Sequence, residues 1–177
     1  MFNIYIDADS LPKSHRAIIL KRVVKESECI GECVFACDRM LSDVKEAQEN
    51  HTAALRLPYR DKLDKLELRK IKTNIQMVVV PVGANSADDY LVENAAITHD
   101  VPLSNRLVEK GIVVLDDRGG IYTSNNIKER LSDRNFMTAL REMGFESEKN
   151  KSFDQRTINE FASSLDTIIN KYKREFC

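Results

Sequence analysis

Short apolar segments alternate with helix-like segments along the first two thirds of this 177-residue chain. Five apolar runs predict strands, at residues 3–7, 33–37, 76–82, 96–98 and 112–115. Segments with helical spacing lie between them and predict helices at residues 12–26, 86–95 and 102–110. Such alternation is typical of a parallel sheet that is covered by helices on both faces. We therefore expect an α/β fold with three layers.

Two of the apolar runs set the expected topology. NIYID (residues 3–7) and QMVVVPV (residues 76–82) are almost continuously apolar, which is typical of strands that are buried on both faces. We expect both strands to lie in the interior of the sheet rather than at its edge.

The last third of the chain predicts further helices. Residues 124–131 and 134–143 each have helical spacing, and residues 146–152 are polar and predict a loop. From Asp154 onward, apolar residues recur on one helical face, so a C-terminal helix at about 154–174 should dock on the sheet and its helices.

Residues 39–75 fit the alternation least. The stretch is too long for a simple connection between two strands, although residues 43–55 could be helical. We interpret it as an insertion at the edge of the sheet, carried by one domain that spans residues 1–177.

Composition excludes some classes of protein. Charged residues make up 31% of the chain and the formal net charge is −1, which excludes a globally basic nucleic-acid coat but allows a local basic surface. The chain has no long apolar run and no basic segment before its first strand, so we expect neither a membrane partner nor a signal peptide. Its four cysteines then predict free thiols in the cytoplasm.

Acidic residues fall at informative places. Asp7 and Asp9 end the first strand, Asp88 and Asp89 begin the helix after the third, and Asp100 follows the short fourth strand. In open parallel sheets, ligands bind beyond the carboxyl ends of the strands, where the strand order reverses. We expect Asp7 and Asp100 to face each other there, with Asp88 completing a ring of carboxylates.

Such a ring predicts a metal site. Two carboxylates about 4 Å apart repel each other by roughly 4 kcal/mol at an effective dielectric constant of 20, so the cluster takes up a proton or a cation. Oxygen ligands favour Mg²⁺ or Mn²⁺, which can activate water and bind phosphate oxygens. Structural roles compete with this interpretation: Asp88 favours a helix dipole, Asp89 could form a capping box with Ser86, and Asp100 could cap the next helix.

Three segments together resemble a known family. IYIDADSLP (residues 4–12), VGANSADDYLV (82–92) and the stretch from ITHDVPL to ALREMG (97–144) resemble, in this order, the YaiI/YqxD family of bacterial proteins, which is similar to PIN-like nucleases. The resemblance implies a PIN-like fold and hydrolysis of phosphodiester bonds, with single-stranded RNA as the expected substrate.

The resemblance also implies roles for individual residues. The catalytic residues would be Asp7, Asp88 and Asp100, and these would hold Mg²⁺ or Mn²⁺ together with Asp9 and Asp89. Asn85 stands where the family more often has Asp, so we expect no strong metal ligand at that position.

Two functions follow from the sequence. The first is a metal-dependent nuclease, with Arg106 and Arg118 of the matching segments as candidate contacts to substrate phosphates. Each arginine could equally form a salt bridge to one of the many acids. The second is a non-catalytic RNA- or protein-binding module that keeps the fold and uses the basic insertion at 39–75 as its contact surface.

Overall fold

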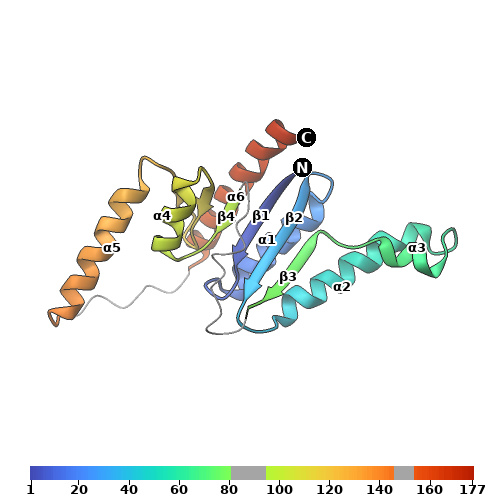
Figure 1. Cartoon of the computed structure of the whole chain (residues 1–177), viewed down its shortest axis with the longest axis horizontal. Helices are drawn as coiled ribbons and strands as arrows, with labels where there is room; N and C mark the ends of the chain where they lie inside the picture. The colour runs from blue at the N-terminus through green and yellow to red at the C-terminus, as the bar shows by residue number, and fades with distance from the viewer. Residues whose placement is uncertain (81–94, 146–153) are drawn as a thin grey trace.

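The computed structural model describes residues 1–80, 95–145 and 154–177, and a sheet runs through the centre of this part of the chain (Figure 1). The described sheet has six strands in the order β3-β2-β1-β4-β5-β6. In chain order the strands are Phe2–Asp7 (β1), Ile30–Cys37 (β2), Ile75–Val79 (β3), Ala95–Ile97 (β4), Val113–Leu115 (β5) and Ile121–Tyr122 (β6). All neighbours pair in parallel except β5 and β6, which are antiparallel. The predicted parallel core is confirmed, and β6 adds a strand that the sequence did not suggest.

Helices cover both faces of the sheet. The helical segments are Lys13–Lys25 (α1), Ser42–Arg56 (α2), Leu57–Tyr59 (η1, a short 3₁₀ helix), Lys65–Lys70 (α3), Val101–Glu109 (α4), Ile127–Glu142 (α5) and Gln155–Phe176 (α6). Buried residues of α1, α2 and α6 share one core cluster, whereas those of α4 and the first turn of α5 share another. The predicted three-layer α/β architecture is therefore confirmed.

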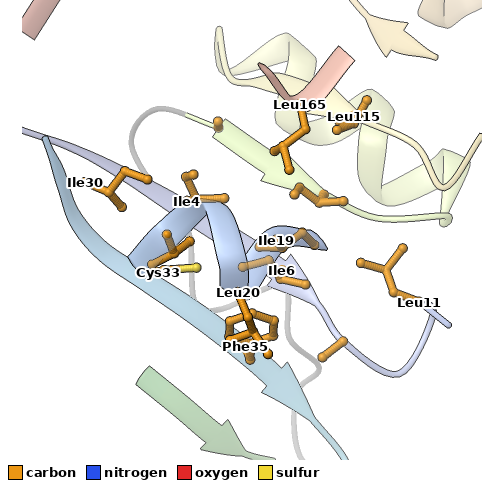
Figure 2. Close-up of a cluster of buried hydrophobic side chains, with 14 of the residues drawn as sticks. Ile4, Ile6, Leu11, Ile19, Leu20, Ile30, Cys33, Phe35, Leu115 and Leu165 are labelled. Atoms are coloured by element: carbon orange, nitrogen blue, oxygen red, sulfur yellow. The ribbon is translucent and has the colours of Figure 1, made fainter. Parts of the chain in front are cut away.

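Alternation along β1 supplies both cores. Ile4 and Ile6 point to the face that is covered by α1, where Ile19 and Leu20 pack against them (Figure 2). Tyr5 lies between them in the chain and belongs to the cluster under α4, because successive side chains of a strand point to opposite faces. Since β1 also pairs with β2 on one side and β4 on the other, it is an interior strand, as predicted.

Cysteine burial follows the same logic. Cys33 and Cys37 of β2 are both buried in the cluster under α1, at two positions on one face of the strand. Burial raises the pKa of the Cys33 thiol well above its usual range. Both side chains therefore act as small apolar residues of the core.

The prediction for the run at 76–82 is wrong for its described part. β3 forms one edge of the described sheet, and Val79 is 45% exposed. An apolar run reports the burial of side chains, which α2 provides for β3 on one face, but it does not report whether the backbone has one paired neighbour or two. Residues 81 and 82 of this run lie outside the described residues.

The insertion at 39–75 contains structure of its own. The helix expected at 43–55 is confirmed as α2, and η1 and α3 follow before the chain enters β3. Asp64 caps α3 through hydrogen bonds from two backbone N–H groups, and Glu67 completes the capping box. Figure 1 shows α3 at the opposite end of the molecule from α5, so the arm that residues 57–74 form extends away from the sheet.

Two further helix predictions need correction. The two helices expected at 124–131 and 134–143 are one continuous helix, α5, because Ser132 and Asp133 between them do not interrupt helical hydrogen bonding. Most of the helix expected at 86–95 and the loop at 146–152 lie outside the described residues. Ala95, the last residue of the former, begins β4 instead.

The C-terminal helix docks as predicted. Five residues of α6 are buried: Phe161, Leu165, Ile168, Ile169 and Tyr172. Ser164 Oγ donates a hydrogen bond to the Gly119 carbonyl oxygen at 2.7 Å, which brings α6 against the turn between β5 and β6. Among the helices of the described ranges, none has the length and apolar character to cross a membrane.

Replacement of Gly119 by alanine tests this close approach. Gly119 has a φ of +88°, and a Cβ atom there would lie 2.8 Å from the backbone carbonyl carbon of Glu160. Gly111 has a similar φ of +80° but no atom within 4 Å of the added carbon. The left-handed backbone alone costs about 1–2 kcal/mol for an L-residue. We expect Gly119→Ala to lower the free energy of unfolding by more than Gly111→Ala in urea denaturation. Equal losses would contradict the packing of α6 described here.

Candidate active site

The carboxyl ends of β1 and β4 lie side by side. In the parallel register Ile6 pairs with Ile97, so Asp7 and Thr98 follow at the same level. Thr98 Oγ1 donates a hydrogen bond to Asp7 Oδ2 at 2.7 Å. Since β1 has β2 on one side and β4 on the other, this is the point where the strand order reverses, and a crevice is expected outside it.

The loop between β1 and α1 is held by several hydrogen bonds. Ser10 Oγ donates to the Asp7 carbonyl oxygen at 2.9 Å. Arg16 donates through Nη1 to the Leu11 carbonyl oxygen at 2.7 Å. Asp9 accepts a short hydrogen bond through Oδ2 from the backbone N–H of Asp38, which follows β2. These contacts fix the carboxylate of Asp9 next to the ends of β1 and β2.

Asp100 has the structural role that the sequence left open. Its Oδ1 accepts a hydrogen bond from the Leu103 N–H at 3.1 Å, so Asp100 is the N-cap of α4. Its own N–H donates to Thr98 Oγ1 at 3.0 Å. The carboxylate is nevertheless exposed, so the cap does not remove it from solvent.

These acidic residues lie along one cleft of about 670 Å³. The β1 and β4 ends contribute Asp7, Asp9, Ser10, His99, Asp100 and Val101. The opposite wall is the exposed side of α5, with Arg130, Asp133, Arg134, Met137 and Arg141. The cleft thus has acidic side chains at the strand ends and mostly basic ones on α5.

Burial and, to a smaller extent, neighbouring charges disfavour the ionised form of Asp9. Its pKa is raised above the usual value by burial and by the negative charges of Asp38 and Asp7. Within the part of the chain that the structure describes, no group of three or more His, Cys, Asp or Glu side chains is arranged to hold a metal ion. Asp88 and Asp89, and with them Asn85, lie outside the described residues.

His99 and Asp117 form a pair at the edge of the cleft. His99 Nδ1 lies 2.9 Å from Asp117 Oδ1, and this hydrogen bond raises the pKa of His99 against the opposing effect of burial. Asp117 is buried, and its carbonyl oxygen lies 2.8 Å from Nε2 of the buried His15. His15 packs in turn against Phe161 of α6. The C-terminal helix therefore helps to position Asp117.

The two arginines that were predicted to contact substrate phosphates are not among the described residues that line this cleft. Arg106 is exposed in the last turn of α4, and Arg118 lines a separate hollow against α6 with Arg156 and Ser163. Among the described residues, the arginines that line the cleft are Arg130, Arg134 and Arg141. Their recurrence at helical spacing is the signal that could have identified them, once residues 127–142 are treated as one helix.

The fold and the cleft together define the structural class of this protein. The described chain is a three-layer α/β protein whose acidic residues gather at the topological switch point of a parallel sheet. Arginines of a later helix face those acidic residues across the cleft.

The chain belongs to the YaiI/YqxD family. The family model described as "Uncharacterized BCR, YaiI/YqxD family" matches residues 36–171. The chain is 33% identical over 173 residues to a UPF0178 protein of Pseudomonas entomophila (strain L48), which covers 95% of this chain and 96% of the relative. It is also 34% identical over 178 residues to a UPF0178 protein of Pseudomonas fluorescens (strain Pf0-1). This match covers 97% of the present chain and 98% of the relative. No solved structure matches the chain.

Titration of His99 tests the pair with Asp117. Because the pair raises the folded-state pKa above the ordinary value of 6.5, its stabilising contribution is complete below pH 6.5 and is lost as the pH rises through the folded-state pKa. We expect Asp117→Asn to lower the pKa of His99, measured by NMR in EDTA. His51 lies in a different part of the fold, so its pKa serves as the internal control. An unchanged His99 pKa would contradict the pairing.

Proposed function

We propose that this protein is a divalent-metal-dependent nuclease that hydrolyses phosphodiester bonds of RNA in the cleft at the β1 and β4 ends. The observation that carries the proposal is the joint placement of Asp7, Asp9 and Asp100 in one cleft opposite the α5 arginines. Carboxylates and arginines on opposite walls suit a ligand that has both a cation and phosphate oxygens. The free thiols of the described cysteines agree with a cytoplasmic location.

Asp7, Asp9 and Asp100 are proposed as part of the ligand set of a hard divalent cation, because the described side chains alone do not form a group of three that could hold one. Oδ2 of Asp7 accepts the hydrogen bond from Thr98, and Oδ1 of Asp100 accepts the one from the Leu103 N–H. Within the described part of the chain, each carboxylate keeps its second oxygen for a ligand. Asp38 and Asp7 place negative charge beside Asp9, and a nearby cation would offset it. Mg²⁺ or Mn²⁺ suits such oxygen donors, and the family resemblance adds Asp88 and Asp89 to the proposed ligands.

Each group would then have a definite task. The bound metal would lower the pKa of a water molecule and offset charge on the phosphate. Asp7 and Asp100 would orient the site, because hydrogen bonds fix the Asp7 carboxylate to the end of β4 and the Asp100 carboxylate to the first turn of α4. Asp117 holds Nδ1 of His99, which leaves Nε2 as the ring atom that could donate a proton to a ligand in the cleft.

A non-catalytic binding module is the second candidate. The arm at residues 57–74 carries six basic and three acidic residues, and Leu57 and Leu66 on it are 67% and 69% exposed. Exposed apolar side chains among basic ones suit contact with RNA or with another protein. This candidate needs no metal and no cleavage, so the experiments below separate it from the nuclease.

Cleavage of a labelled single-stranded RNA tests the proposal directly. We expect cleavage with Mn²⁺ or Mg²⁺ and none with EDTA. Asp7→Asn should reduce the rate by at least about a hundredfold, because it removes a proposed metal ligand but keeps the shape of the side chain. Asp61→Asn on the arm is the matched control and should cleave like the parent, since Asp61 is exposed and remote from the cleft. Equal cleavage by the parent and Asp7→Asn would contradict the proposed site.

Asp100→Asn separates the cap from the metal site. Asparagine is as good an N-cap as aspartate, so the free energy of unfolding in EDTA should fall little, or rise as like-charge repulsion is removed. In the parent, Mn²⁺ at a hundredfold excess over its dissociation constant should add roughly 2.7 kcal/mol to that free energy. The variant should lose most of this response in chemical denaturation. A variant that is clearly less stable in EDTA and keeps the full Mn²⁺ response would defeat the assignment.

A further inference from the structure

Helix α5 presents an arginine stripe to the cleft. We define the stripe as Arg130, Arg134 and Arg141, with Met137 between them. At about 100° per residue, these four positions fall within roughly 60° of one another around the helix axis. The stripe is thus a straight row along one side of α5. Over eleven residues at about 1.5 Å each, the row is about 16 Å long.

The arginines of the stripe are available to a ligand. Of all α5 residues only Ile127 is buried, and Arg134 and Arg141 are both exposed. In the part of the chain that the structure describes, neither of these two side chains forms an ion pair. Arg130 is anchored through Nε to the Tyr122 hydroxyl at 3.3 Å, and Tyr122 donates to Asp116. The stripe therefore has one end anchored to Tyr122 of β6 and an exposed end further along α5.

The charges of the cleft are separated rather than paired. Its strand-end wall has three carboxylates, whereas the α5 wall has three guanidinium groups and the single carboxylate of Asp133. A phosphate that approaches the strand ends alone is repelled by Asp7, Asp9 and Asp100. A row of arginines on the facing wall offsets that repulsion and binds further phosphates of the same strand.

We propose that the arginine stripe binds the sugar-phosphate backbone of a single-stranded nucleic acid and leads it along α5 to the acidic strand ends. This inference rests on the proposed function, because it assigns the substrate path of the same cleft. A row of about 16 Å has the length of a few nucleotides of one strand. One row of cations on one helix matches one backbone, whereas a duplex presents two. Among the described residues that line the cleft there is no Phe, Tyr or Trp, so this part of the lining favours backbone contact over base stacking.

Salt-dependent binding tests the stripe without any cleavage. Fluorescence anisotropy with labelled oligouridylate, in EDTA and at about 50 to 200 mM NaCl, gives the slope of log K against log salt concentration. The double variant Arg134→Gln/Arg141→Gln should reduce that slope by about 1.4, at about 0.7 for each lost phosphate contact on a single strand. Glutamine keeps helix propensity close to that of arginine, so α5 should persist.

The matched control removes two charges from the arm instead. Lys62→Gln/Lys65→Gln changes the same net charge in the region at 57–74 and should leave the slope unchanged. With the deoxy form of the strand, the stripe variant should show the same reduction in slope. A duplex of equal length should bind the parent more weakly than the single strand does. No binding by the parent, an unchanged slope in the stripe variant, a loss confined to the arm variant, or tighter binding of the duplex would each overturn the proposal.

The outcomes distinguish this inference from the proposed function. Metal-dependent cleavage with an unchanged slope in the stripe variant would overturn the stripe and leave the nuclease standing. A reduced slope without cleavage in any metal would support the stripe and overturn the nuclease.

Discussion

Parallel pairing of β1 with a strand on each side is the constraint on which the rest of the molecule depends. Helices bury β1 on both faces, and because β2 and β4 pair with its two edges, its carboxyl end becomes the point where the chain turns to opposite sides. Asp7 stands at that end as the first residue beyond the buried run. The hydrogen bond from Thr98 then fixes its carboxylate to the neighbouring strand.

Elements distant in sequence complete this edge of the sheet. Arg16 of α1 fixes the loop that carries Asp9, and α6 packs against the turn that presents Asp117 to His99. The two walls of the cleft differ in how they are held. Hydrogen bonds hold Asp7 to the end of β4 and Asp100 to the first turn of α4, whereas α5 has one buried residue near its start and extends along the cleft as an exposed helix. A tightly held acidic wall suits a metal ion, and an exposed basic wall suits a long, variable substrate.

Side-chain patterns made much of the fold predictable. NIYID and the helical face after Asp154 report burial, and together with the strand–helix alternation they decide the fold class. Edge position was not predictable, because Val79 and its neighbours have an apolar pattern that fits one paired neighbour as well as two. In the site, strand-end acids followed from topology, whereas the α5 arginines did not, because a helix divided into 124–131 and 134–143 has no continuous face. Asp117 was missed since only the fold brings it to His99.

Anomalous scattering from a crystal of this protein soaked in Mn²⁺ tests most directly the central claim that the cleft binds a divalent metal ion. The proposed function predicts a manganese peak in the cleft within coordination distance of carboxylate oxygens of Asp7 and Asp100, with Asp9 bound directly or through water. The same map would show whether Asp88 and Asp89 complete the site. A cleft without a peak, in a crystal whose Asp7 and Asp100 carboxylates are open to the soaking solution, would contradict the metal-dependent mechanism and favour the binding module.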